Sequence, residues 1–275
     1  MVGDIKCVHV VPVGTSLLGN VARSSSLGGR VRELGFEGWD RWSPDDPRQK
    51  NLCERRSEVH GLLREFLDSS RYEASAELYP LNMALNRFGC VRERSLVILY
   101  STNTCNSRIA REALADFLRR EGFEVVEKEI IAIRSQEDFD NGLVSILDEV
   151  IEEIIKWRDS GARVYVNATP GFKAEVSFLV IASLMSCVDG VYYSHESFRE
   201  LVVLPGLPLA IRGEFLEKLR YFEEPREPSE AEEIIGSSEI LRDLLLRGLI
   251  QRKDGKYMIR EWIKKIISVS PTKCL

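Results

Sequence analysis

The segment VYVNATPGFK, residues 164–173, combines residue types that could bind a phosphate group. It begins as a short buried strand, turns at polar residues and enters an apolar helix predicted over residues 172–186. Thr169 can cap this helix, and Pro170 suits its first position. Free amides at a helix start, with Lys173 in the first turn, attract an anion. An ordinary strand-to-helix turn is the open alternative for this segment.

Two other polar turns follow predicted strands. The apolar run Ser95–Tyr100 is typical of a strand buried on both faces, and the polar residues 101–106 follow it. The first predicted strand, Lys6–Pro12, leads into the small and polar residues 14–16. In parallel sheets, ligands bind outside the carboxyl ends of the strands. We therefore expect these two turns and residues 167–173 to line one pocket.

Strands alternate with helices through the first three quarters of the chain. Further strands are predicted over residues 124–133, 190–194 and 201–204, and helices over residues 74–88, 107–121 and 138–160. Such alternation predicts an α/β fold, a Rossmann-like, doubly wound and mostly parallel sheet. This predicted domain covers residues 1–206.

The remaining residues, 207–275, predict a small winged-helix domain. Three short helices are followed by a hairpin that turns at Asp254–Gly255. The third helix carries acidic as well as basic residues, and DNA-like character is confined to the hairpin and its flank, with Arg252, Lys253, Lys256 and Arg260. DNA binding through this domain stays open, but an interaction or dimer-supporting role is favoured.

Composition narrows the classes of partner. The 275 residues are 44% hydrophobic and 29% charged, as in soluble globular proteins. A net charge of −5 argues against broad binding to long nucleic acid and leaves room for a small phosphorylated ligand. No apolar run approaches the roughly 18 residues that span a bilayer, and the N-terminus does not resemble a signal peptide. A cytoplasmic protein without membrane contact is expected.

The six cysteines form no Cys-x-x-Cys pair, and several lie in apolar segments. Reduced, mostly structural thiols are therefore expected, in place of disulfides or metal ligands. The three histidines are scattered, so no metal site is predicted.

Four segments, taken in order, resemble a known family. They are Val13–Leu18, Ser75–Leu78, Tyr100–Thr104 and Asn167–Lys173. Together they resemble CRISPR-associated Rossmann-fold (CARF) proteins, and more narrowly the ring-nuclease branch of type III systems. The resemblance covers about residues 1–204, and a C-terminal winged helix is also similar to that branch. Pro170 departs from the family pattern, which often has a second glycine there, and this alters the amides that face the ligand.

The resemblance implies a function. The family binds cyclic oligoadenylates, usually cyclic tetra-adenylate, across a homodimer interface, and ring nucleases cleave the ring to linear di-adenylate with a 2′,3′-cyclic phosphate. No metal or other cofactor is implied, because positioning and electrostatics can suffice. Lys173 would stabilise the phosphorane charge or the leaving oxygen, and Ser16 would hydrogen-bond the 2′-hydroxyl or a phosphate oxygen. Plainer roles stay open: Lys173 as a simple phosphate ligand, and Ser16 as a helix cap.

The candidate ligand-binding residues lie in the three turns and at the start of one following helix. They are Gly14, Thr15, Ser101, Thr102, Asn103, Thr104, Asn106, Arg108, Asn167, Thr169, Pro170, Gly171 and Phe172. Asn167 and Thr169 could serve only to organise their turn, and Arg108 could be a solvated surface charge.

Two other functions compete with ring cleavage. The same pocket could sense the ring without cutting it, with the winged helix acting as a transcriptional regulator. Alternatively, Arg55 and His60 have the Arg-x4-His spacing of HEPN ribonucleases. That pair lies inside the predicted Rossmann domain rather than in an appended helical domain, which weighs against a ribonuclease.

Overall fold

The structure is a computed structural model that describes residues 4–130, 149–171, 173–194, 200–204 and 212–260, together with residues 206, 207, 209, 263, 264 and 267. For residues 173–175 it describes the backbone only. The chain forms two compact units. The first is Met1–Ser183 with Val188–Gly206, and the second is Leu184–Cys187 with Leu207–Leu275.

Within these residues, the first unit contains a six-stranded sheet with the strand order β3-β2-β1-β4-β5-β6. The strands are β1 (Cys7–Val13), β2 (Ser95–Thr102), β3 (Glu124–Ile130), β4 (Arg163–Asn167), β5 (Gly190–Ser194) and β6 (Leu201–Leu204). All neighbours pair in parallel except β5 and β6, which are antiparallel. The chain adds strands on one side of β1 and then on the other, so the order reverses between β1 and β4. The predicted Rossmann-like, mostly parallel sheet is confirmed.

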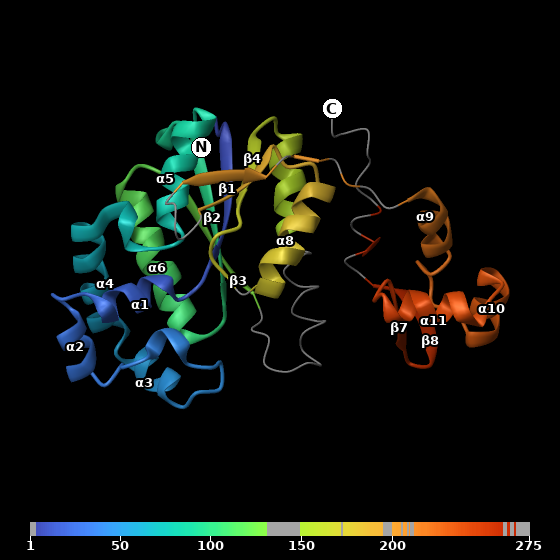
Figure 1. Cartoon of the computed structure of the whole chain (residues 1–275), viewed down its shortest axis with the longest axis horizontal. Coiled ribbons are helices and arrows are strands. Elements are labelled where there is room, and N and C mark those ends of the chain that lie inside the picture. Colours follow the sequence, from blue (N-terminus) through green and yellow to red (C-terminus); the bar gives the residue numbers. More distant parts are fainter. Residues whose placement is uncertain are drawn as a thin grey trace. The chain divides into compact units, whose positions relative to one another are not determined.

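Helices cover both faces of this sheet (Figure 1). One face carries α1 (Ser16–Arg23), α2 (Gly28–Glu33), α3 (Arg48–Glu54), α4 (Arg56–Ser70), α5 (Leu78–Phe88) and α6 (Cys105–Arg120). Short 3-10 helices η1 (Trp39–Arg41), η2 (Arg71–Ala74) and η3 (Arg92–Arg94) connect these elements. On the other side lies α8 (Lys173–Met185). A helix is also described over residues 149–159. The remainder of the helix predicted from residue 138, and the end of the strand predicted to residue 133, lie outside the described residues.

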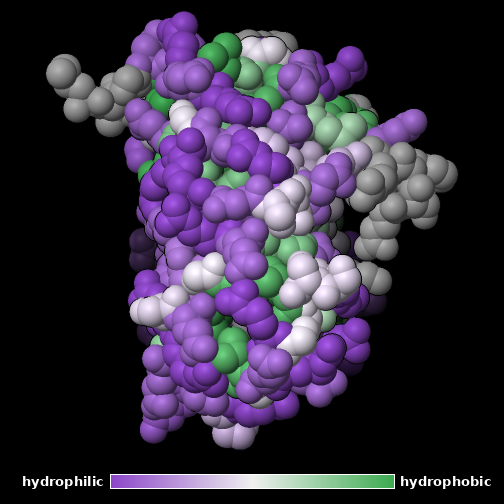
Figure 2. Space-filling model, turned by 90° about the vertical axis from the view of Figure 1, so that its left-hand side faces the viewer, coloured by the Kyte–Doolittle hydropathy of each residue, from purple (hydrophilic) through white to green (hydrophobic). Residues whose placement is uncertain are grey.

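The core of the first unit explains these positions. In β1, Val11 and Val13 contribute to the cluster under α1 and α4–α6, as alternate residues of a strand do. In α6, Ile109, Ala113 and Phe117 recur every four residues and are fully or almost fully buried in that cluster. The face that carries α2 and α4 is mostly hydrophilic (Figure 2), with ion pairs such as Arg30–Glu65 across its helices.

The expectation of reduced cysteines is wrong. Disulfides join Cys7 to Cys90 and Cys53 to Cys105, and Cys187 is also disulfide-bonded. The two pairs are 83 and 52 residues apart in sequence, so no local spacing reveals them. Folding brings their Cα atoms to 6.0 and 5.7 Å, within the range that a disulfide spans. Cys274 lies outside the described residues.

The second unit has a core of its own, formed by Leu219, Phe222, Ala231, Ile235, Leu241, Leu244, Ile250, Ile259 and Ile263. Its elements are α9 (Gly213–Arg220), α10 (Pro228–Ile235), α11 (Ser238–Leu246), β7 (Ile250–Lys253) and β8 (Lys256–Ile259). Ser237 caps α11 by accepting the Ile240 N–H. Asp254 and Gly255 both have positive φ, as a two-residue type I′ hairpin turn requires. The order of elements is the one expected, and its assignment as a winged helix stays a prediction.

In the described parts of both units, no helix has the length and apolar character needed to cross a membrane.

Candidate functional site

The structure brings the three polar turns to one edge of the sheet. They follow β2, β1 and β4, which are adjacent parallel strands, and β1 and β4 flank the point at which strand order reverses. Val13 pairs with Ser101, so the turns after β1 and β2 start at the same level. This edge is where open α/β sheets bind ligands.

The turn after β1 is organised by Glu77, which precedes α5. The Gly14 N–H donates to Glu77 Oε1 at 2.9 Å, and the Ser16 hydroxyl donates to Oε2 at 2.7 Å. The Ala76 N–H in turn donates to Ser16 Oγ at 3.1 Å. The Glu77 side chain is buried, with the residue only 1% exposed. The neighbouring Thr15 hydroxyl donates to the Asp40 carbonyl at 2.7 Å, which ties the turn to η1.

The turn after β4 is attached to the same segment. The Asn167 side chain is fully buried, and its Nδ2 donates to the Glu77 carbonyl at 3.1 Å. Asn167 Oδ1 accepts the Thr169 N–H at 3.0 Å, and Thr169 Oγ1 accepts the Ser194 N–H at 3.0 Å. Asn167 and Thr169 therefore organise this turn and link it to α5 and β5.

The predicted helix cap at Thr169 is wrong. Within the described residues α8 begins at Lys173, so Thr169 and Pro170 precede the helix, and the Thr169 hydroxyl is engaged with β5 instead. Phe172 lies outside the described residues, and so does the side chain of Lys173. The backbone of Lys173 nevertheless starts α8 two residues after Gly171.

Two glycines allow the turns after β1 and β4 to pack together. Gly171 has a φ of +110°, and a Cβ atom there would lie 3.0 Å from Val176 Cγ2. A Cβ atom on Gly14 would lie 3.6 Å from the Gly171 nitrogen. The backbones of the two turns therefore pass close to each other at these glycines, and Gly171 cannot be replaced without strain.

In the turn after β2, the polar side chains bond to the protein itself. Ser101 Oγ accepts a hydrogen bond from buried Arg111 Nη1 at 2.9 Å, and Thr102 and Thr104 share one at 3.0 Å. The Asn103 N–H donates to the Ile130 carbonyl. These contacts fasten the turn to α6 and β3.

The first residues of α6 make similar structural contacts. Asn106 is almost fully buried, its Nδ2 donates to the Trp39 carbonyl at 3.1 Å, and its N–H donates to Gln49 Oε1. Arg108 forms a two-fold hydrogen-bonded ion pair with Glu129 at 2.9 and 3.2 Å. Both side chains, proposed as ligand contacts, are thus used to hold the fold in the free chain.

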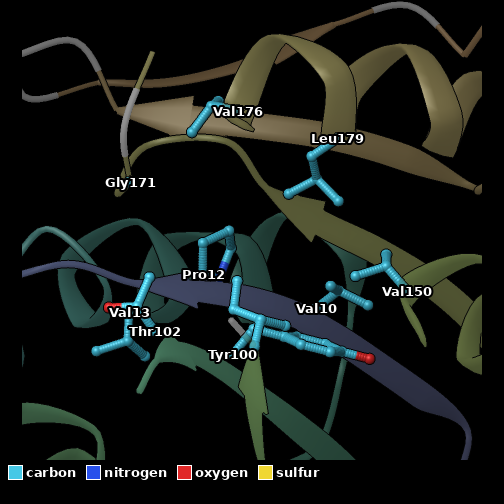
Figure 3. Close-up of a pocket in the computed structure, with 10 residues that line it drawn as sticks. Val10, Pro12, Val13, Tyr100, Thr102, Val150, Gly171, Val176 and Leu179 are labelled. Atoms are coloured by element: carbon cyan, nitrogen blue, oxygen red, sulfur yellow. The ribbon is translucent and has the colours of Figure 1, made fainter. Parts of the chain in front are cut away.

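A cavity of about 40 Å³ lies under the turns, on the side of the sheet that faces α8. Figure 3 shows Val176 and Leu179 of α8 directed towards Val10 and Pro12 of β1, with Gly171 at one end. The cavity is mainly apolar and far below the roughly 300 Å³ or more of a ligand pocket. It is a packing space in which a ligand of nucleotide size does not fit.

Tyrosine and histidine side chains close to the site do not supply a base. Burial, with nearby glutamates adding to it, raises the pKa of Tyr100 far above its usual value, so its hydroxyl stays protonated. Burial, followed by the charge of Arg163, lowers the pKa of His9 to about 3. His9 Nδ1 lies 3.2 Å from Tyr192 Oη, and its ring is fully buried in the sheet. His9 is a neutral core residue.

Arg55 and His60 do not form a joint site. Arg55 donates to Glu58 and to the Leu34 carbonyl, whereas His60 Nε2 lies 3.3 Å from Asp116 on α6. Among the residues that the structure describes, no three histidine, cysteine or carboxylate side chains gather as a metal site would require.

Glu77 is the residue that sequence reasoning missed. Its motif, Ser75–Leu78, was noticed, but the contact with Ser16 joins residues 61 positions apart. One feature of the sequence could have identified it. Glu77 stands between small residues and an apolar helix, a place where a solvent-exposed charged side chain is not expected.

Comparison with known families supports a broad assignment. Residues 72–207 match the model of a family described as CRISPR-associated protein (Cas_APE2256). Over these residues, which are just under half of the chain, the protein is similar to CRISPR-associated proteins. The match includes Glu77 and the turns after β2 and β4, and it agrees with the resemblance to CARF proteins. The ring-nuclease branch stays a prediction.

Among solved structures, the chain is similar to a crystal structure of protein VC1899 from Vibrio cholerae. The two are 12% identical with a TM-score of 0.39, over 94% of this chain and 66% of the other. The chain thus spans slightly less than two thirds of the length of that protein.

Proposed function

We propose that this protein is a CRISPR-associated ring nuclease. It binds cyclic tetra-adenylate across a homodimer interface and cleaves it, without a metal ion, to linear di-adenylate with a 2′,3′-cyclic phosphate. The activity removes the messenger and so switches off type III antiviral signalling. The observation that carries this proposal is the fixed Ser16 hydroxyl after β1, in a turn whose Gly14 lies beside Gly171 of the turn that leads to Lys173.

The chemistry needs little from the protein beyond position and charge. The ribose 2′-oxygen attacks the adjacent phosphorus, a 2′-O–P bond forms, and the bond from phosphorus to the 5′-oxygen breaks. Ser16 Oγ donates to Glu77 and accepts from the Ala76 N–H, which leaves one acceptor position for a 2′-hydroxyl. Lys173 supplies positive charge for the phosphorane or the leaving oxygen. The remainder of the rate enhancement comes from holding the attacking and leaving atoms in line.

A homodimer matches the symmetry of the ligand. A ring of four identical nucleotides has a two-fold axis, and a two-fold protein dimer presents each site residue twice around such an axis. Two copies of Ser16 and Lys173 would then act on opposite sides of the ring, which accounts for di-adenylate as the product.

The alternative, a sensor that does not cleave and regulates transcription, finds less support in the second unit. Lys256 in the hairpin is paired with Glu227, and Arg247 after α11 is paired with Asp243. Acidic partners beside these cations reduce the positive field that DNA binding needs.

The test of the proposal is turnover of labelled cyclic tetra-adenylate in EDTA. Wild-type protein should release linear di-adenylate, and Lys173→Ala should remove cleavage while the protein stays folded. Lys156→Ala is the matched control, because the Lys156 side chain is exposed and pairs with Glu153. Tight binding without turnover would overturn the enzyme in favour of the sensor. Unchanged turnover in Lys173→Ala would remove Lys173 from the mechanism.

A further inference from the structure

Glu77 is an unusual carboxylate in this molecule. Other well-covered carboxylates of the first unit are balanced by cations, as Glu121 is by Arg71 and Arg92, and Glu153 by Lys128 and Lys156. Glu77 is 1% exposed, yet no lysine or arginine pairs with it among the described side chains. Burying a charge in this way is unfavourable unless the group is needed there.

The side-chain hydrogen bonds of Glu77 both go to the turn after β1. Glu77 stands at the N-terminal cap of α5, but its side chain makes no capping hydrogen bond to that helix. Its two carboxylate oxygens are instead taken by the Gly14 N–H and the Ser16 hydroxyl. Its carbonyl accepts from Asn167, so the same residue also holds the turn after β4. Glu77 therefore connects both turns of the candidate site to the start of α5.

The arrangement forms a path for one proton. The Ser16 proton points to Glu77 Oε2 at 2.7 Å, while the Ala76 N–H fixes Ser16 Oγ from another direction. A ligand hydroxyl that donates a hydrogen bond to the free acceptor position of Ser16 Oγ is thus two proton transfers away from a buried carboxylate. Glu77 itself does not reach a ligand, because Ser16 and Gly14 occupy its oxygens.

We propose that Glu77 is a positioning residue that makes Ser16 a proton acceptor, an inference that rests on the proposed ring cleavage. As the 2′-oxygen attacks phosphorus, its proton passes to Ser16 Oγ and the Ser16 proton passes to Glu77 Oε2. The 2′-O–P bond forms and the bond to the 5′-oxygen breaks. The 5′-oxygen takes one proton from solvent, and Glu77 later returns one through Ser16, so that protons balance. The substrate class is a phosphodiester next to a free 2′-hydroxyl.

The first test is Glu77→Gln, which keeps the size of the side chain and removes its charge and its basicity. Single-turnover cleavage of cyclic tetra-adenylate should fall by about 100-fold to 10,000-fold, the range of general base catalysis, with ring affinity changed less than about threefold. Ser16→Ala combined with Glu77→Gln should be no slower than Ser16→Ala alone, because the two residues act as one unit.

Glu121→Gln is the matched control. Glu121 is a well-covered carboxylate at the end of α6, on the opposite edge of the sheet, where it holds Arg71 and Arg92. Its replacement should lower thermal stability and leave cleavage per folded molecule unchanged. A Glu77 that only supports the fold would behave in the same way, and that result would overturn the inference.

A second measurement uses the unaltered protein, in case Glu77→Gln fails to fold. In mixtures of H2O and D2O, two protons that move together give a curved dependence of the single-turnover rate on deuterium fraction. A linear dependence would contradict the relay, while wild-type cleavage would still support the proposed function. Absence of cleavage by the wild type would overturn both proposals together.

Discussion

The turns after β1 and β2 lie side by side at one edge of the sheet, and both contain hydroxyl side chains. In the turn after β2, Ser101 is bonded to Arg111 and Asn106 to the loop around Trp39. In the turn after β1, the Ser16 hydroxyl is bonded to a carboxylate and keeps an acceptor position for a ligand. The difference teaches that polar residues at a strand end do not by themselves mark a site. Their partners decide whether they hold the fold or remain available for chemistry.

Serine substitutions in the two turns should separate these roles most clearly. Ser16→Ala should lower single-turnover cleavage by about 100-fold or more, since it removes the group that receives the 2′-hydroxyl proton. Ser101→Ala should leave cleavage per folded molecule within about twofold. It should cost about 1–2 kcal/mol of unfolding free energy, because buried Arg111 loses a partner. Equal effects on cleavage would break the distinction between the turns.

Acid should lower the free energy of unfolding of the sheet that carries both turns, because His9 lies in its strand β1. Its pKa of about 3 in the folded protein is below the 6.5 of an unfolded histidine. The unfolded chain therefore binds the proton first, and stability is full above pH 6.5 and is lost as pH falls towards 3. We expect a loss of about 3 kcal/mol between pH 7 and pH 4 from this residue. Urea unfolding at several pH values should give a flatter dependence for His9→Asn, and an equal dependence would contradict the assignment.

Gly171→Ala tests the contact between the turns after β1 and β4. The added methyl group would meet Val176 at 3.0 Å in a backbone conformation that favours glycine, so we expect a loss of about 1–3 kcal/mol and weaker ring binding. Gly161→Ala is the matched control, because Gly161 also has a positive φ but no atom within 4 Å of an added Cβ. Thermal unfolding and ring affinity, measured for both, isolate the packing of the turn from backbone strain. Equal loss of ring affinity in both variants would argue against a role for the contact.

The smallest effect is expected for Arg108→Ala. Arg108 is about one-third exposed and paired with Glu129, and exposed ion pairs contribute about 0–1 kcal/mol. Ring affinity should change less than about twofold if Arg108 serves only this pair. A tenfold loss of affinity would show that Arg108 leaves Glu129 for a phosphate, and would extend the site to the turn after β2.

Much of the fold could be predicted from hydrophobic pattern. The continuous apolar runs of β1 and β2 are buried on both faces, and the repeat in α6 marks one buried side. In a parallel sheet the carboxyl ends of the strands lie at one edge, so the three turns could be placed together there. The helix start near Thr169 was misplaced because its hydroxyl bonds to β5, a contact between segments that local sequence does not contain.

The parts that could not be predicted depend on long-range partners. Cys53 and Cys105 meet only because α3 packs on the start of α6, and their spacing carries no signal. Glu77 reaches Ser16 across 61 residues, and Arg108 meets Glu129 across 21. The sequence does not distinguish Ser16, which has a free acceptor position, from Ser101, which is bonded to an arginine.

The most direct measurement is the fate of cyclic tetra-adenylate with the wild-type protein under single-turnover conditions in excess EDTA. The account predicts complete conversion to linear di-adenylate ending in a 2′,3′-cyclic phosphate, with conversion strongly reduced in Ser16→Ala. Recovery of the intact ring from a tight complex with the wild type would contradict it.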